Sequence, residues 1–204
     1  DLSDDSRYNI DARLARKEEE FTKAAVLAHG LRIEAIADDG LVVPSQGLRV
    51  SVIVGDRGPR DVSVRSVTFS GFTTDGGCPT SPLTAGGVFR CDATVNVPGD
   101  AKTTRPYWKR LASAARYEFE PDAPFGLPSR PTPFRARVAL TLAGSDVNLD
   151  LPIRYRYEGK ALEGEKRMEI TVVPRLALVT TPAIGRRPRA GQSRPRASAV
   201  AGIR

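Results

Sequence analysis

Apolar residues recur at every second position in several short runs, and this alternation constrains the fold more than any other feature of the sequence. A period of two puts the apolar side chains of a run on one face of an extended strand, where they can be buried together. Turn residues such as Asp38-Asp39-Gly40 and Gly144-Ser145 separate the runs. The alternating runs lie at 31–35, 48–54, 62–69, 89–97, 138–142, 147–153 and 168–172.

These runs predict a mainly β protein. About seven short strands with turns between them are typical of two antiparallel sheets packed face to face, so we expect an immunoglobulin-like antiparallel β-sandwich over residues 31–174. The clearest hairpin joins 138–142 to 147–153. Within 62–69 the phase of the alternation shifts at Ser66, which predicts a β-bulge there.

The segment before the first strand has the spacing of one amphipathic α-helix over residues 11–29. Asn9 or Asp11 can cap its start, and Gly30 supplies the stop. The opposite side is charged and is expected to face water. The apolar side must pack on something, either the following sheet or a preceding domain. The residues of this apolar side are Leu14, Phe21, Ala24, Ala25 and Ala28.

The positive charge is concentrated at the C-terminus. The 204 residues carry a net charge of +7, but six arginines lie in the last twenty residues, so the remainder carries only +1. Residues 185–204 are mostly Arg, Pro, Ala, Gly and Ser, which predicts a disordered basic tail. Weak, salt-dependent binding of nucleic acid by this tail is an alternative that we do not favour. No apolar run is long enough to predict a membrane span.

Two cysteines, Cys78 and Cys91, are separated by twelve residues. A hairpin could bring them together as a disulfide, which would place the protein in an oxidising compartment. Two separate buried thiols are the other interpretation. A disulfide requires a Cα separation of about 4.4 to 6.8 Å.

Few residues are suited to catalysis or metal binding. His29 is the single histidine, so a histidine-rich zinc site or a Ser-His-Asp arrangement is not predicted. Nucleotide-binding loops of the GxxxxGK[ST] or GxGxxG type are also absent from the sequence. A calcium site at Glu118, Glu120 and Asp122 is an alternative, because oxygen ligands suffice for it. We predict no catalytic residue and no metal ligand in this chain.

The stretch from 102 to 133 is unusually long for a loop and is rich in Pro, Arg and aromatic residues. Arg105, Tyr107, Trp108 and Lys109 form the candidate carbohydrate-binding site, with Arg110 beside them. Aromatic rings pack on the apolar faces of sugars, and cationic side chains bind their hydroxyl and carboxylate groups. The alternative is that the rings plug one end of the sandwich.

Several segments, in the same order along the chain, resemble the region that follows the catalytic domain in long bacterial PIG-L family (LmbE-like) deacetylases. The resemblance covers about residues 1–182. The segments are 6–14, the helix up to His29-Gly30-Leu31, 37–44, Arg105-Pro106-Tyr107-Trp108, 125–128, Tyr155-Arg156-Tyr157, 164–167 and Val172-Val173-Pro174.

Members of this family are zinc hydrolases that remove acetyl groups from N-acetylglucosamine-type sugars with an Ala-His-Pro-Asp-Asp type motif. Asp4-Asp5 has no preceding His-Pro, so no active-site residue carries over. The resemblance therefore implies a non-catalytic accessory segment of a secreted or periplasmic enzyme, whose zinc belongs to a tethered catalytic domain. Residues 1–30 would be the linker helix after that domain. The alternative is a stand-alone β-sandwich module that binds a polysaccharide through the candidate site, or another protein. Residues 175–184 would begin a further β segment that the tail truncates.

Overall fold

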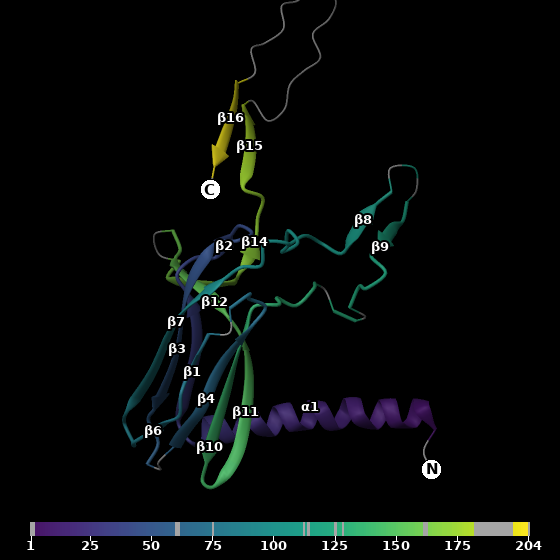
Figure 1. The fold of residues 1–204 in the computed structure, drawn as a ribbon. Coiled ribbons are helices and arrows are strands. Elements are labelled where there is room, and N and C mark those ends of the chain that lie inside the picture. The colour runs from purple at the N-terminus through teal and green to yellow at the C-terminus, as the bar shows by residue number, and fades with distance from the viewer. Residues whose placement is uncertain are drawn as a thin grey trace, which may run out of the picture.

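A computed structural model describes residues 3–59, 62–74, 76–111, 113, 115–124, 126–127, 129–160, 163–181 and 198–203. The protein is mainly β, and most of its strands lie in two five-stranded sheets (Figure 1). The first sheet has the order β13 (Glu165–Glu169), β12 (Arg154–Glu158), β1 (Leu31–Ala37), β3 (Gly47–Asp56) and β7 (Val88–Asn96). The second has the order β11 (Ser145–Pro152), β10 (Arg135–Leu142), β4 (Val62–Ser70) and β5 (Gly77–Cys78), with β6 (Ser81–Leu83) also paired to β4.

Three short strand pairs lie outside these two sheets. The pairs are β2 (Leu41–Val42) with β14 (Thr171–Val172), β8 (Trp108–Arg110) with β9 (Tyr117–Phe119), and β15 (Leu176–Thr181) with β16 (Ser198–Ile203). Figure 1 shows the β8–β9 hairpin projecting away from the two main sheets.

Burial follows the alternation of the sequence. In β3 the apolar residues Leu48, Val50, Val52 and Val54 are fully buried, and the residues between them are exposed or partly exposed. The buried side chains of both main sheets form one hydrophobic core. The predicted mainly β fold class is therefore confirmed.

The predicted bulge and hairpin both occur. The register of β4 against β10 shifts so that Ser66 pairs with Ala139 and Val64 with Leu140, which leaves Arg65 as the extra residue, one position before the predicted Ser66. Strands β10 and β11 pair in register from Arg135–Pro152 to Leu142–Ser145. Their turn contains Ala143 and Gly144, which both have positive φ, at 48° and 82°.

Two strand pairs correct the expectation of purely antiparallel sheets. Strand β12 lies parallel to β1, and β14 lies parallel to β2. After β11 the chain crosses from the second main sheet to the first and runs beside β1 in the same direction. Alternation specifies which face of a strand is buried but carries no information about the direction of its neighbour.

Helix α1 (Asp4–Ala28) begins earlier than predicted. Its N-cap is Ser3, whose side chain accepts a hydrogen bond from the backbone N–H of Ser6 at 3.3 Å, so the proposed caps Asn9 and Asp11 are wrong. Asp4 and Asp5 occupy the first turn, where carboxylates interact favourably with the helix dipole. The capping serine, more than the apolar spacing, sets the start of this helix.

The apolar side of α1 is not covered by the sheets. Leu14 is 61% exposed and Phe21 is 75% exposed, and the residues of the helix that pack against the core are Ala25 and Val26. Figure 1 shows the helix projecting beyond the sheets, held at its C-terminal end. Of the two alternatives, the following sheet therefore covers only the C-terminal end of the stripe, at Ala25.

A small junction fastens the end of α1 to the turn after β3. The imidazole Nδ1 of His29 lies 2.9 Å from the carbonyl of Ala25. Gly30 adopts a φ of 68°, and its carbonyl accepts a hydrogen bond from the N–H of Arg57 at 3.2 Å. The buried carboxylate of Asp56 accepts a hydrogen bond from the N–H of Gly58 at 2.8 Å.

The close approach at this junction gives a first prediction. A Cβ at Gly58 would lie 2.1 Å from the carbonyl oxygen of His29, and this backbone atom cannot yield without moving the helix end. We expect Gly58→Ala to lower the free energy of unfolding by about 2 kcal/mol, measured by urea denaturation. The matched control is Gly55→Ala, whose Cβ would meet only the Arg32 carbonyl at 3.9 Å. Equal stabilities of the two variants would contradict the prediction.

The C-terminal tail is only partly described. Ser198–Ile203 form β16, antiparallel to β15, so the prediction of a disordered tail is wrong for these six residues. They include Val200 and Ile203, the β-branched residues of the tail, which favour strand pairing. Residues 182–197 and 204 of the predicted segments lie outside the described part of the chain.

Candidate functional site

The β8–β9 hairpin separates its side chains onto two faces. Trp108 pairs with Phe119, and Arg110 pairs with Tyr117, so these four side chains share one face. Lys109 pairs with Glu118 on the opposite face. We call Trp108, Tyr117 and Phe119 together the aromatic face.

The aromatic face is open to solvent. Trp108 is 43% exposed, Tyr117 is 54% exposed and Phe119 is 59% exposed. The rings of Trp108 and Tyr117 meet edge to face, with centroids 4.9 Å apart. Adjacent exposed rings of this kind are a common feature of ligand-binding and protein-binding surfaces, so the aromatic face is the candidate site.

Tyr107, the residue directly before β8, anchors the hairpin segment. It is buried, its hydroxyl donates a hydrogen bond to the carbonyl of Leu127, and its ring centroid lies 6.0 Å from that of Phe119. Its own carbonyl accepts a hydrogen bond from the N–H of Glu120 at 2.8 Å. Tyr107 is therefore an anchor of the segment and is too buried to stack on a ligand.

Most charged side chains around the hairpin are paired with one another. Arg105 binds Glu120 at 3.1 Å, and Lys109 binds Glu118 at 2.9 Å. Arg130 bridges Glu120 and Asp122, at 3.1 and 3.0 Å. The hydrogen bond from Arg130 lowers the pKa of the Asp122 carboxyl.

The strand register and the ion pairs show where the four predicted site residues lie. Of Arg105, Tyr107, Trp108 and Lys109, only Trp108 lies on the aromatic face. The carboxylates considered as calcium ligands are instead paired with cations. Sequence reasoning missed Tyr117 and Phe119, although the Tyr117-x-Phe119 spacing already indicates that the two share a strand face.

A disulfide joins the two main sheets. It links Cys78 of β5 to Cys91 of β7, and their Cα atoms are 5.8 Å apart. This separation lies within the range that a disulfide needs. Cys91 is buried in the core, and Cys78 is partly exposed.

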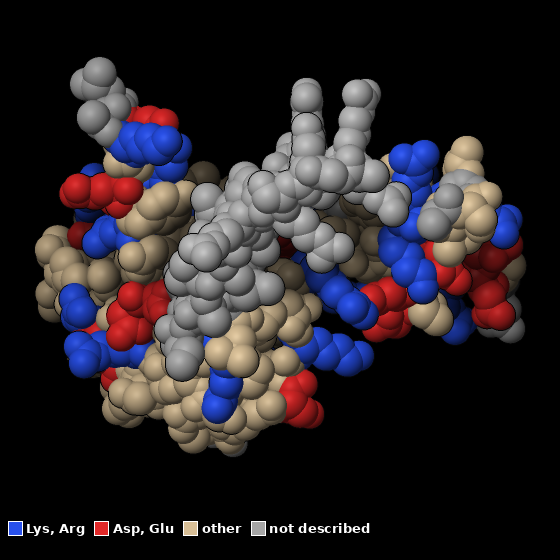
Figure 2. Space-filling view, turned by 90° about the horizontal axis from the view of Figure 1, so that it is seen from above, with Lys and Arg blue, Asp and Glu red and all other residues tan. Residues whose placement is uncertain are grey.

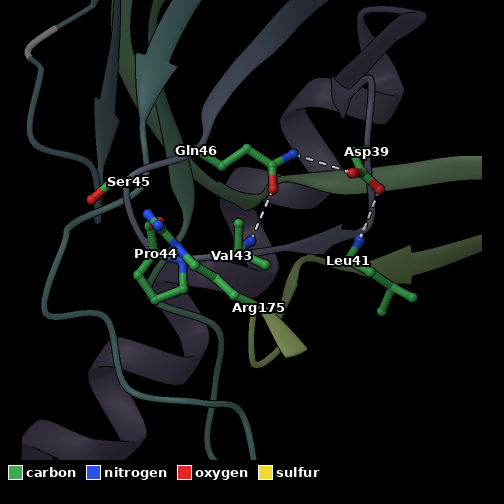
Figure 3. A pocket seen from close by; sticks show the side chains of 7 residues that line it. All are labelled: Asp39, Leu41, Val43, Pro44, Ser45, Gln46 and Arg175. Carbon is green, nitrogen blue, oxygen red and sulfur yellow. Dashed lines mark hydrogen bonds between the residues drawn. The ribbon is translucent and has the colours of Figure 1, made fainter. Parts of the chain in front are cut away.

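A hollow of about 350 Å³ lies at the loop between β2 and β3 (Figure 3). Gln46 reaches across it, accepting a hydrogen bond from the N–H of Val43 at 2.9 Å and donating one to Asp39 at 3.2 Å. Arg175 donates to the carbonyl of Pro44 at 3.0 Å. These hydrogen bonds hold the loop in place. The polar groups of the hollow are therefore engaged within the protein, and we do not select the hollow as the candidate site.

The residues present do not fit a zinc site. His29 is engaged with the Ala25 carbonyl at the end of α1. Among the residues that the structure describes, no three His, Cys, Asp or Glu side chains are grouped so as to hold a metal ion. Within the same part of the chain, no helix has the length and apolar character of a membrane span.

Comparison with known proteins gives no family. No protein-family model and no curated protein matches the sequence. Solved structures with partial similarity include Spo0M, a sporulation control protein from Bacillus subtilis, with a TM-score of 0.37 and 11% identity over 70% of this chain and 49% of that one. Another is the alkylpurine DNA glycosylase AlkC from Pseudomonas fluorescens, bound to DNA containing an abasic site analog (TM-score 0.29, 10% identity, 67% and 35% coverage). A third is a late embryogenesis abundant protein (TM-score 0.31, 13% identity, 82% and 87% coverage). The chain thus spans about half of the Spo0M chain and about a third of the AlkC chain.

Proposed function

We propose that this chain is a non-catalytic immunoglobulin-like β-sandwich module that binds carbohydrate through the aromatic face. The observation that carries the proposal is the grouping of three exposed rings on one face of a projecting hairpin. Pyranose rings have apolar C–H faces, and aromatic side chains bind such flat apolar surfaces with little loss of conformational freedom.

Two features support the sandwich part of the proposal. The two five-stranded sheets share one core, as two sheets packed face to face do. The Cys78–Cys91 disulfide connects the sheets, as an inter-sheet disulfide does in antibody domains. A disulfide of this kind persists in oxidising compartments, which supports a secreted or periplasmic location.

The PIG-L resemblance supplies the wider role. We infer that the module is the accessory segment of a PIG-L-like deacetylase and keeps a tethered catalytic domain close to its polysaccharide. Tethering raises the effective concentration of the catalytic domain at a bound polymer without any new catalytic contact. The zinc chemistry would then belong to the tethered domain, because this chain offers one histidine.

The second prediction tests carbohydrate binding. Trp108 is the only tryptophan of the chain, so its fluorescence reports directly on the aromatic face. We expect a glycan panel that includes N-acetylglucosamine oligomers and uronic-acid oligomers to contain a ligand that changes this fluorescence. Tyr117→Ala and Phe119→Ala should each weaken its binding about tenfold, because each removes one ring of the platform.

Tyr157→Ala is the matched control, because Tyr157 is a partly exposed tyrosine on β12 of the first main sheet. Its removal should leave binding unchanged. A panel without any fluorescence response would contradict the carbohydrate part of the proposal. Turnover of N-acetylated sugars by the purified chain with added zinc would contradict the non-catalytic part.

A further inference from the structure

Arg110 differs from Arg105, Lys109 and Arg130, the cations that form ion pairs around the hairpin. It lies on the same face as the exposed rings, directly across from Tyr117, and its side chain is exposed. Arg105, Lys109 and Arg130 are each paired with a carboxylate. Arg110 makes no side-chain hydrogen bond or ion pair with any residue in the described part of the chain. The aromatic face therefore carries one cation that none of the described residues neutralises.

We propose that the aromatic face selects an acidic glycan, namely an oligosaccharide that contains uronic acid. This inference rests on the proposed carbohydrate binding and names the class of sugar. A guanidinium matches a carboxylate with two parallel hydrogen bonds, which adds orientation as well as attraction.

The spacing suits a single sugar unit. Trp108 and Arg110 are two residues apart on one strand, so their Cα atoms are about 7 Å apart. A pyranose ring stacked on Trp108 then places a carboxylate at its edge within reach of the long Arg110 side chain. The rings hold the sugar, and Arg110 distinguishes a charged sugar from a neutral one.

The charges nearby favour a sugar over a nucleic acid. Single-stranded nucleic acid requires a positively charged groove that follows its backbone. Here Arg110 is the one cation at a register position of the aromatic face, and Glu118, Glu120 and Asp122 elsewhere on the hairpin segment hold Lys109 and Arg130 in ion pairs. Figure 2 shows basic and acidic side chains intermixed on this side of the molecule. A polyanion with a charge on every unit of a long backbone would find one unpaired cation on this face, whereas a uronic acid needs only one.

The test compares oligogalacturonate with its methyl ester, two probes that differ in the charge of the carboxylate. Calorimetry on the full chain should show oligogalacturonate binding about tenfold more tightly than the ester. Arg110→Gln should abolish this preference by weakening the binding of oligogalacturonate to the level of the ester. Lys109→Gln is the matched control, because Lys109 lies on the opposite face, and it should keep the preference.

The outcomes separate the two proposals. Equal binding of acid and ester, or a preference that survives Arg110→Gln, would overturn the selection of acidic sugars and leave carbohydrate binding intact. Failure of both probes and of the whole neutral panel would overturn both proposals. Tighter binding of an oligothymidylate than of oligogalacturonate, lost in Phe119→Ala, would show that the face binds nucleic acid and would also overturn both.

Discussion

Opening the Cys78–Cys91 disulfide is expected to lower the free energy of unfolding by about 3 kcal/mol. The bond closes a loop between residues 13 apart in sequence and connects β5 of one main sheet to β7 of the other. Without it the unfolded chain gains conformational freedom, and the two sheets lose the cross-link between β5 and β7. Urea denaturation of the oxidised and the reduced protein measures the difference with no change of sequence.

The double variant Cys78→Ala/Cys91→Ala separates the bond from other effects of reductant. Its stability should match that of the reduced protein to within the small cost of losing the buried sulfur of Cys91, and reductant should not change it further. A protein whose urea midpoint is the same with and without reductant would show that the bond does not stabilise the fold.

The largest effect of a single substitution is expected for Phe134→Ala, a loss of about 3 to 5 kcal/mol. Phe134 is 1% exposed, and its ring lies 4.9 Å from the ring of Phe72. Its backbone extends the β10–β11 pairing by one position, because its carbonyl accepts a hydrogen bond from the N–H of Ile153 at 3.1 Å. Truncation would leave a cavity that this backbone contact prevents from collapsing.

The same substitution at Phe119 is the control. Phe119 is 59% exposed, so Phe119→Ala should change the free energy of unfolding by less than about 1 kcal/mol. The two variants thus separate folding from ligand binding, since Phe134→Ala should affect the urea midpoint and Phe119→Ala the affinity. A small effect at Phe134 would mean that this part of the core repacks freely.

The strands of the two sheets were largely predictable from the sequence. Alternation located β3 and the β10–β11 hairpin because in each case one face of the strand is buried. The parallel course of β12 beside β1 was not predictable, since it depends on where the chain crosses between sheets. The start of α1 was missed because its apolar residues are exposed, and its limit is set by the Ser3 cap.

The candidate site was predictable only in part. The sequence pointed to Trp108 and its neighbours, but adjacent residues of a strand face opposite ways, so Tyr107 and Lys109 lie elsewhere. The residues that join Trp108 on the aromatic face are Tyr117 and Phe119, because β9 pairs with β8 across the hairpin loop. That pairing is a property of the folded hairpin, and neither three-residue strand shows a clear signal of its own.

Because α1 is attached to the sheets at its C-terminal end, a small rotation there moves its N-terminal end a long way. A helix of 25 residues is about 37 Å long, so a rotation of about 10° at its base would carry the far end through about 6 Å. The helix is attached by the packing of Ala25 and Val26 on the core and by close backbone contacts between Gly30 and Gly58. A single methyl group added at that point would therefore change the direction in which the whole helix extends.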